Sequence, residues 1–399
     1  MSAVENRENL SKPFQIWYEN RHLYAKNWKE NHKRPVIGMM CTYVPEEILY
    51  AAEMLPVRIL GGHEPQALTE SHIFSMFCPF SRDALAQGLK GKYDYVDAIV
   101  LSHSCLHFRQ TFTSWKMHLP IQWSYYLPMP NQVQSPYAKQ EFQNEVQKFK
   151  THIEQVSGKS LTPESLIQST ALLDKNRSLL RKIYDLRKQE NPPITGADAV
   201  YMALTSQFVS KEDHNKALEE VLKQVEQFAS SQKISHKETE IREIRTRETG
   251  VRLMTIGSEN DDVKFFEMVE SLPATIVCDE QCAGSRYFWN PSVHSGDPVK
   301  TIANRYIDRP PCPTKDYPER RRFTHILKLV KEYQVQGVIL MQEKFCDPHE
   351  ADNPALKKFL EENEIPTLTL EFDSTNPLGP LKIRVEAFLE TLSTEELFS

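Results

Sequence analysis

Apolar runs that are each followed by a helical repeat of apolar positions recur along this chain. Residues 337–341 (GVILM) form a continuous apolar run, as in a parallel strand buried on both faces. Cys346 follows it, then Asp347 and Pro348, and then apolar residues at helical spacing. Pro348 suits the first turn of a helix, where a missing N–H costs nothing. We therefore predict that Cys346 lies between a strand's carboxyl end and a helix's amino end, where the helix dipole favours a thiolate.

The first third of the chain repeats this pattern. Residues 93–105 (YDYVDAIVLSHSC) follow the same order as residues 333–346 (YQVQGVILMQEKFC): a tyrosine, a short turn, four apolar residues, a polar stretch and a cysteine. Further apolar runs match in pairs. The expected strands are residues 36–40, 57–60 and 121–128 in the first copy, and residues 251–254, 274–277 and 365–372 in the second. We therefore expect two α/β domains of one plan, each with a parallel sheet and a cysteine at a strand's carboxyl end.

The same patterns divide the chain into four segments. They are an amphipathic helical segment (1–34), a first α/β domain (35–135), a helical segment joining the domains (136–247) and a second α/β domain (248–399). The charged residues 233–248 are expected to form an exposed connector. Within the second domain, we expect a long polar loop after Cys278 and a helix over residues 317–333.

Composition narrows the classes of protein that fit. The 399 residues include 48 Lys and Arg and 54 Asp and Glu, so the net charge is −6, and there is no long basic run. Nucleic acid is therefore not expected as a partner. No apolar stretch approaches the roughly 18 residues of a membrane span, and the polar start does not resemble a signal peptide. We expect a cytoplasmic protein. Seven cysteines, an odd number spread over a long chain, indicate free thiols or metal ligands rather than disulfides.

Three cysteines share one local setting, because Cys78, Cys105 and Cys346 each stand just before an expected helix start. One interpretation is that they are inert core cysteines, the usual role of a buried Cys. The other is that they bind metal. Three thiolates can hold a [4Fe–4S] cluster by three irons and leave the fourth iron open to another ligand.

The remaining cysteines have less specific settings. Cys278, Cys282 and Cys312 could form a further cluster or a zinc site, but a structural or pocket-lining role is favoured. Cys41 ends an expected strand and could reach the same cleft, as a neighbour rather than a ligand.

Several polar and aromatic residues surround Cys105. They include His103, His107 and Arg109. A histidine there could move protons or donate a hydrogen bond to a sulfur, or it could be an ordinary surface or core residue. The aromatic residues are core residues or walls of an apolar pocket for an aromatic substrate. They are Phe108, Phe112, Trp115, Trp123, Tyr125 and Tyr126.

No nucleotide-binding loop is expected. Residues 157–160 (SGKS) resemble the end of a P-loop, but the glycine required five residues before Gly158 is Ile153, and the segment lies between two expected helices. No G-x-G-x-x-G is present.

Nearly the whole chain resembles one family, which holds the 2-hydroxyacyl-CoA dehydratases and the ATP-dependent benzoyl-CoA reductases. Among its members the chain looks most similar to the C subunit of benzoyl-CoA reductase. The segments that carry the resemblance are residues 41–62, 75–89, 101–115, 278–289 and 309–313, and above all residues 341–373 (MQEKFCDPHEADNPALKKFLEENEIPTLTLEFD).

The resemblance implies a function and a ligand set. Cys78, Cys105 and Cys346 would hold a [4Fe–4S] cluster in the cleft between the two domains. The chain would pair with a homologous second core subunit. A separate activator with its own cluster would hydrolyse ATP and pass on electrons from a ferredoxin-type donor. The reaction implied is two-electron reduction of benzoyl-CoA to a cyclohexadiene-carbonyl-CoA. Alternatives are radical dehydration of a 2-hydroxyacyl-CoA to an enoyl-CoA, and a role as an electron-carrying cluster protein.

Overall fold

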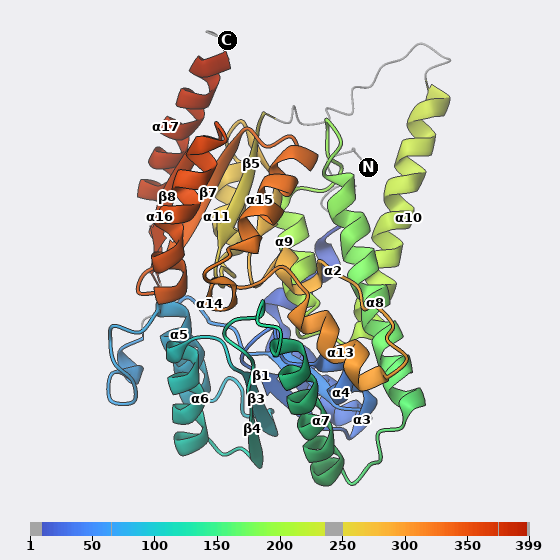
Figure 1. The fold of residues 1–399 in the computed structure, drawn as a ribbon. Coiled ribbons are helices and arrows are strands. Elements are labelled where there is room, and N and C mark those ends of the chain that lie inside the picture. Colours follow the sequence, from blue (N-terminus) through green and yellow to red (C-terminus); the bar gives the residue numbers. More distant parts are fainter. Residues whose placement is uncertain (1–9, 65, 236–249, 374, 397–399) are drawn as a thin grey trace.

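A computed structural model describes residues 10–64, 66–235, 250–373 and 375–396 (Figure 1). The elements of the first part are α2 (Lys12–Glu19), α3 (Arg21–His32), β1 (Val36–Met39), α4 (Glu46–Ala51), β2 (Leu55–Arg58), η1 (Ala67–Thr69), α5 (Pro79–Leu89), β3 (Ala98–Ser102), α6 (Leu106–His118) and β4 (Trp123–Leu127). Four helices follow: α7 (Ala138–Ser157), α8 (Pro163–Leu186), α9 (Gly196–Thr205) and α10 (Lys211–Ser235). The last part contains β5 (Val251–Gly257), α11 (Val263–Glu270), β6 (Ala274–Glu280), α12 (Ser285–Phe288), α13 (Pro298–Ile307), α14 (Pro313–Asp316), α15 (Arg321–Glu332), β7 (Gly337–Glu343), α16 (Asp347–Glu362), β8 (Thr367–Phe372) and α17 (Leu378–Glu396).

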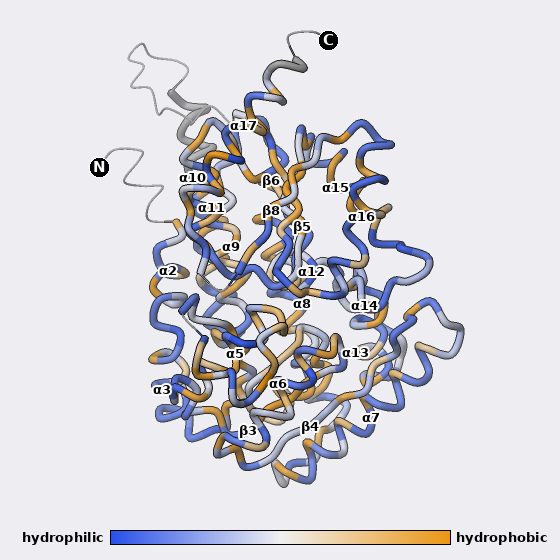
Figure 2. The backbone as a smooth tube through the Cα atoms, turned by 90° about the vertical axis from the view of Figure 1, so that its left-hand side faces the viewer, coloured by the Kyte–Doolittle hydropathy of each residue, from blue (hydrophilic) through white to orange (hydrophobic). Residues whose placement is uncertain are grey.

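Two four-stranded sheets confirm the predicted α/β repeat. The strand orders are β2-β1-β3-β4 and β6-β5-β7-β8, and every pair of neighbouring strands is parallel. The central strands are buried along their whole length because helices cover both faces of such a sheet. Figure 2 shows that the apolar positions gather in the interior of both halves, with hydrophilic positions along the outer helices. The two sheets therefore share one order, as the repeat predicted.

The helices between the two sheets contact both of them. Helix α8 packs against α4 of the first half and against α12 of the second, and α7 packs against β4 and α13. Helix α9 contacts β6 and α11, and α10 lies along α8 (Figure 1). A buried charge network strengthens this connection, since Arg177 on α8 donates to Glu47 on α4 at 2.6 Å and Tyr306 on α13 donates to the same carboxylate at 2.9 Å. These helices therefore fix the position of one sheet relative to the other.

Two predictions about the second half are wrong. The helix expected from residue 317 begins at Arg321, because the Asp316 carboxylate accepts the backbone N–H groups of Arg321 and Arg322 and so starts the helix there. The polar loop expected after Cys278 starts after Glu280 and is interrupted by the short buried helix α12, whose first N–H, that of Ser285, is accepted by the Asp279 carboxylate at 2.7 Å. The connector predicted at residues 233–248 lies mostly outside the described residues.

Residues 157–160 confirm the rejection of a phosphate-binding loop. Gly158 follows the last residue of α7 with φ of 66°, a left-handed conformation that glycine adopts without steric cost. The segment is a helix C-cap before α8, and not a loop between a strand and a helix. None of the described helices combines the length and the apolar character needed to cross a bilayer.

Candidate metal centre

Six of the seven cysteines line one cavity. They are Cys41, Cys78 and Cys105 from the first half of the chain, and Cys282, Cys312 and Cys346 from the second. The cavity is formed where the carboxyl ends of strands in both sheets face one another: residues just after β1, β3, β5, β6 and β7 all contribute to its wall. The carboxyl ends of parallel strands are the usual place for a ligand in an α/β sheet.

The three cysteines singled out from the sequence each occupy the position before a helix. Cys78, Cys105 and Cys346 are the N-cap residues of α5, α6 and α16. Their carbonyl groups accept the first helical N–H in each case, from Arg82, Arg109 and Glu350. Three helix N-termini, each with partial positive charge, therefore meet at the wall of one cavity. This placement suits an anionic group.

Burial controls the ionisation of these thiols in the metal-free chain. It raises the pKa of Cys78 to about 11 and that of Cys105 to about 12, and the charge of Cys78 adds to the shift at Cys105. Burial likewise raises the pKa of Cys346. Burial thus opposes the thiolate that the helix dipole favours in the metal-free chain. A bound metal reverses this balance, because a coordinating thiol is deprotonated outright.

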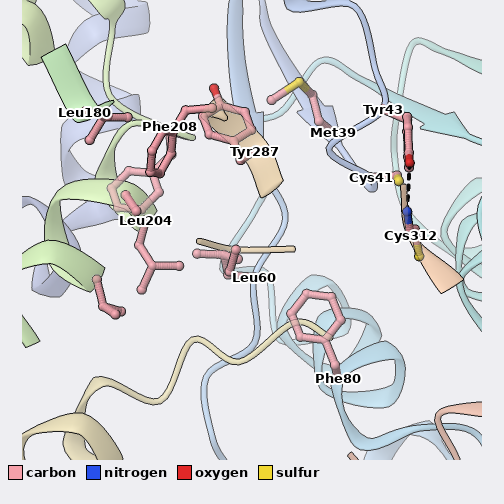
Figure 3. Packing of buried hydrophobic residues seen from close by; sticks show 14 of the residues in the cluster. Met39, Cys41, Tyr43, Leu60, Phe80, Leu180, Leu204, Phe208, Tyr287 and Cys312 are labelled. Carbon is pink, nitrogen blue, oxygen red and sulfur yellow. Dashed lines mark hydrogen bonds between the residues drawn. The ribbon is translucent and has the colours of Figure 1, made fainter. Parts of the chain in front are cut away.

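The other four cysteines do not group in the structure as the sequence suggested. The sequence grouped Cys282 and Cys312 with Cys278, but Cys278 is buried within β6 and does not line the cavity. Cys282 hydrogen-bonds Cys312 through the side chains, and Cys312 is the member of the pair whose pKa is lowered, through that bond and the nearby Arg286 and despite burial. Cys312 donates its N–H to the Tyr43 hydroxyl at 3.1 Å, beside Cys41 (Figure 3).

His107 connects the segments that carry the first set of cysteines. Its Nδ1 accepts the backbone N–H of Cys78 at 3.1 Å, and its Nε2 lies 3.3 Å from the carboxylate of Asp347 on α16. The ring also stacks on Phe77, with centroids 4.5 Å apart. Burial lowers the pKa of His107. The residue therefore positions the N-termini of α5 and α16 relative to each other.

The other residues around Cys105 contribute less to the cavity than predicted. His103 does not line it, and burial lowers the pKa of His103 to about 4. Arg109 is exposed on α6. Of the six aromatic residues near Cys105, as the structure describes them, Phe108 lines the cavity, joined by Phe80 from α5. Trp115 is a core residue, since only 1% of it is exposed. The expected aromatic wall is therefore only partly present.

Several buried charged groups at the cavity carried no signal in the sequence. Arg58 lies over the rings of Phe80 and Phe108, 5.9 and 5.6 Å from their centres, and forms an ion pair with Glu259. Burial raises the pKa of Glu343, which also lines the cavity, to about 8. Only the tertiary structure brings these three charged residues together, because they come from three separate segments.

The donor set fits a cluster better than a single ion. Within the described ranges, no three His, Cys, Asp or Glu side chains are arranged to hold one metal ion. A zinc ion needs four ligands at about 2.0–2.3 Å from one point. A polynuclear iron–sulfur cluster instead binds each cysteine through a different iron, so its thiolate ligands stand further apart. Cys78, Cys105 and Cys346 around one thiol-rich cavity fit that arrangement.

The fold and this cavity define a class: a protein of two parallel α/β sheets whose strand ends enclose a cavity lined by cysteines. The chain belongs to the 2-hydroxyglutaryl-CoA dehydratase D-component family, whose model matches residues 41–392. The resemblance predicted from the sequence is thus confirmed.

Three relatives illustrate the range of the family. The chain is 24% identical over 376 residues to the C subunit of benzoyl-CoA reductase from Thauera aromatica, covering 92% of this chain and 94% of that one. It is 24% identical over 392 residues to the (R)-phenyllactyl-CoA dehydratase beta subunit from Clostridium sporogenes, covering 98% and 100%. It is also 24% identical over 366 residues to the (R)-2-hydroxyglutaryl-CoA dehydratase beta subunit from Acidaminococcus fermentans, covering 90% and 93%. These relatives are subunits of reductases and dehydratases that act on CoA thioesters.

Proposed function

We propose that this chain is an iron–sulfur core subunit of an ATP-dependent benzoyl-CoA reductase that works in the cytoplasm. The reaction proposed is the two-electron, two-proton reduction of the aromatic ring to a cyclohexadiene-carbonyl-CoA. The observation that carries the proposal is the convergence of Cys78, Cys105 and Cys346, from three helix N-termini, on one cavity. The likeness to a reductase subunit supports it.

The residues at the cavity have distinct roles in this proposal. Cys78, Cys105 and Cys346 bind a [4Fe–4S] cluster, which would supply single electrons of low potential. The N-termini of α5, α6 and α16 stabilise the negative charge of the thiolates and the cluster. Phe80 and Phe108 form an apolar wall that keeps water from a reduced ring. His107 holds two of the three ligand segments in place through Cys78 and Asp347.

The proposal includes partner proteins. The described residues 157–160 are a helix cap, so this segment supplies no phosphate loop, and ATP hydrolysis is assigned to a separate activator with its own cluster. The activator takes electrons from a ferredoxin-type donor, and the enzyme also includes a homologous second core subunit. Exposed apolar side chains flank the three cysteines in the sequence and suit contacts with these partners. They are Phe74, Met76, Leu106 and Phe345.

A second candidate is the beta subunit of a 2-hydroxyacyl-CoA dehydratase, which the equal identities to dehydratase subunits support. A third is an electron-carrying cluster protein. The presence of Cys41, Cys282 and Cys312 in the same cavity supports this candidate, because these thiols line a part of the cavity that a substrate would otherwise contact.

Turnover by the assembled enzyme separates the three candidates. The chain is purified anaerobically with its second core subunit and activator and is given ATP, a low-potential donor and benzoyl-CoA. A reductase takes two electrons from the donor for each molecule of cyclohexadiene-carbonyl-CoA that it forms. A dehydratase converts a 2-hydroxyacyl-CoA to the enoyl-CoA with only catalytic donor and leaves benzoyl-CoA untouched, which would contradict the proposal. Reduction of the chain without conversion of either thioester would identify an electron carrier.

A further inference from the structure

We infer that Arg58 is a catalytic residue that holds the thioester carbonyl of the substrate in the cavity and stabilises the negative charge that forms on its oxygen. The inference rests on the proposed function in one respect, since it assumes that an acyl-CoA thioester enters the cavity. It applies to a reductase and to a radical dehydratase alike, because an electron is added to a thioester in both reactions.

The place of Arg58 in the fold brings it to the cavity. Arg58 is the last residue of β2, at the carboxyl end of a parallel strand, where α/β sheets bind ligands. It lines the cavity, and only 2% of it is exposed. Because a buried guanidinium is rare and costly unless it has partners, its presence at this wall requires a physical reason.

The ion pair with Glu259 compensates the charge of Arg58 but leaves some of its donors unused. Nη2 of Arg58 donates to the carboxylate of Glu259, which comes from the second half of the chain. Nε and Nη1 are buried and have no hydrogen-bond partner among the residues that the structure describes. Because buried donors without a partner are costly, they indicate an absent ligand. Arg58 is therefore anchored by one nitrogen and has two nitrogens available to an oxygen acceptor.

The surroundings of Arg58 suit an aromatic acyl group. Its guanidinium carbon lies 5.9 Å from the ring centre of Phe80 and 5.6 Å from that of Phe108, and the two rings stack with their centres 5.3 Å apart. An apolar wall thus lies beside a charged hydrogen-bond donor. A benzoyl thioester has the matching parts, a flat apolar ring and a carbonyl oxygen. In the inferred complex the ring contacts Phe80 and Phe108, and the oxygen accepts from Arg58.

The other buried cations of this region have more of their donors occupied. Arg309 lines the cavity, but both of its Nη groups donate to Thr42, at 2.8 and 2.9 Å. The Lys315 ammonium does not line the cavity and contacts two neutral oxygens at 3.4 and 3.1 Å. Of the guanidinium groups that line the cavity in the described part of the chain, Arg58 is the one with two unpartnered nitrogens.

The proposed reaction creates negative charge at the oxygen that Arg58 would hold. The first electron, taken from the low-potential donor through the activator, adds to the conjugated ring and carbonyl without breaking a bond. The product is a radical anion, and its charge spreads onto the carbonyl oxygen. In a cavity that excludes water, donors fixed in advance at that oxygen lower the energy of this anion. The guanidinium gives up no proton in this step, and its hydrogen bonds strengthen as the charge develops.

Binding to the assembled core tests the inference without turnover. The chain and its second core subunit are prepared without the activator, and calorimetry compares benzoyl-CoA with S-benzyl-CoA, in which a methylene replaces the carbonyl. The wild type is expected to bind benzoyl-CoA about tenfold more tightly, the effect of one hydrogen bond from a charged donor. Arg58→Lys keeps a cation beside Glu259 but lacks the planar set of N–H donors, so it should bind the two compounds equally.

Arg187 supplies the matched control. It is also buried with Nε and Nη1 unpartnered in the described part of the chain, but it does not line the cavity. Arg187→Lys is therefore expected to keep the tenfold preference. Thermal unfolding checks that each variant folds. If Arg58→Lys does not, Arg58→Met combined with Glu259→Gln removes both charges of the ion pair and carries the test.

Turnover gives a second readout. With the activator, ATP and donor present, Arg58→Lys is expected to lower kcat about a hundredfold and to raise KM by no more than about tenfold, because the oxygen carries more charge in the transition state than in the bound substrate. The iron content of the core should be unchanged, since Arg58 is not assigned as a metal ligand.

The outcomes separate this inference from the proposed function. A tenfold preference that persists in folded Arg58→Lys would overturn the role of Arg58 and leave the proposed reduction intact. Loss of iron in Arg58→Lys with the preference retained would also overturn it and would assign the unpartnered donors to the metal centre. If the enzyme instead dehydrates a 2-hydroxyacyl-CoA, and Arg58→Lys abolishes its preference for that thioester over the thioether, the role of Arg58 stands and the proposed reduction fails. A core that binds neither compound would contradict both.

Discussion

The two halves of this protein share a sheet order but differ in what surrounds their equivalent cysteines. Cys105 and Cys346 both follow the third strand of their half and both precede a helix. Around Cys105 the neighbours are a ring and an imidazole, Phe108 and His107. Behind Cys346 lie His349 and the guanidinium groups of Arg286 and Arg322, which interact electrostatically with that imidazole. The same backbone plan therefore places an aromatic ring and an imidazole beside one cysteine, and an imidazole with two guanidinium groups behind the other.

This difference separates what the repeated backbone determines from what the side chains determine. Parallel strands bring cysteines to one edge whatever the side chains around them, so the backbone fixes where the ligands stand. The surrounding side chains then set the charge and the access of water at each ligand. The following predictions test this comparison, from the largest expected effect to the smallest.

Loss of either equivalent cysteine should have the largest effect. Because Cys105 and Cys346 each bind one iron of the same cluster, Cys105→Ser and Cys346→Ser are each expected to lose that cluster, about four irons per chain. Iron analysis and the visible absorption of anaerobically purified protein measure the loss. Cys278→Ser, on β6, should keep its iron. A Cys105→Ser variant that retains all its iron would show that the two halves do not contribute equally to binding the cluster.

The charged environment of the second half gives the next largest effect. The Glu280 carboxylate lies 2.9 Å from Nε of Arg286 and 2.7 Å from Nη1 of Arg322, and all three side chains are fully buried. Glu280→Gln leaves two buried cations without this anion, so we expect the free energy of unfolding to fall by about 3–5 kcal/mol. Denaturant unfolding of the metal-free chain measures the change.

An exposed carboxylate in the same half provides the control. Glu361 pairs with Lys357 one turn away on α16, and both side chains are at least half exposed. Glu361→Gln should therefore cost no more than about 0.5 kcal/mol. Equal losses in Glu280→Gln and Glu361→Gln would show that the buried charges are already compensated by other groups.

The contact between the halves should make stability depend on pH. His63 follows β2, and its Nε2 lies 3.0 Å from the carboxylate of Asp261 in the second half. Burial alone would lower the pKa of His63, but Asp261 outweighs it and raises the value to about 10. Because the pKa of His63 is higher in the folded chain than in the unfolded chain, where it is about 6.5, this contact contributes its full stabilisation below about pH 6.5. The stabilisation is lost as the pH rises through about 10.

Unfolding measured between pH 6 and 10 tests this contact. The wild type should lose stability across this window, whereas His63→Gln and Asp261→Asn should each flatten the same part of the profile. The double variant should flatten it no further, because both substitutions remove one interaction. A sloping profile in His63→Gln would assign the pH dependence to other groups.

The last prediction concerns ATP, for which no binding is expected. No phosphate-binding loop occurs in the part of either half that the structure describes, and the SGKS segment is a helix cap, so the isolated chain is expected not to bind ATP. Calorimetry with ATP and magnesium measures this, and Lys159→Ala should behave as the wild type. Binding by the isolated chain would contradict the assignment of ATP to a separate activator.

Much of this arrangement was predictable because it depends on local pattern. The apolar runs gave both sheets, and the settings of Cys78, Cys105 and Cys346 gave three helix starts, since Pro79, Pro348 and the helical spacing act over a few residues. The family followed from motifs of the same kind and is confirmed. The domain boundaries and the ligand roles of the three cysteines remain predictions.

The grouping of the cysteines and the burial of the charged residues could not be predicted from local sequence patterns, because both depend on contacts between distant parts of the chain. Cys282 looked nearer to Cys278 than to Cys41, yet the chain direction after β6 carries Cys282 out of the strand and into the cavity. The buried roles of Arg58, Arg309 and Lys315 had no signal in the sequence, because a charged residue is usually exposed. Their burial depends on partners more than a hundred positions away in the chain.

The sequence by itself thus determined most of the elements, their parallel arrangement, the repeat and the placement of single cysteines at strand and helix ends, since each depends on short-range periodicity and helix-start residues. Only the tertiary structure decided which cysteines share a cavity and which buried cations face them. That outcome depends on how α7, α8 and α9 pack the two sheets together, so that the carboxyl ends of both sheets meet at one cavity.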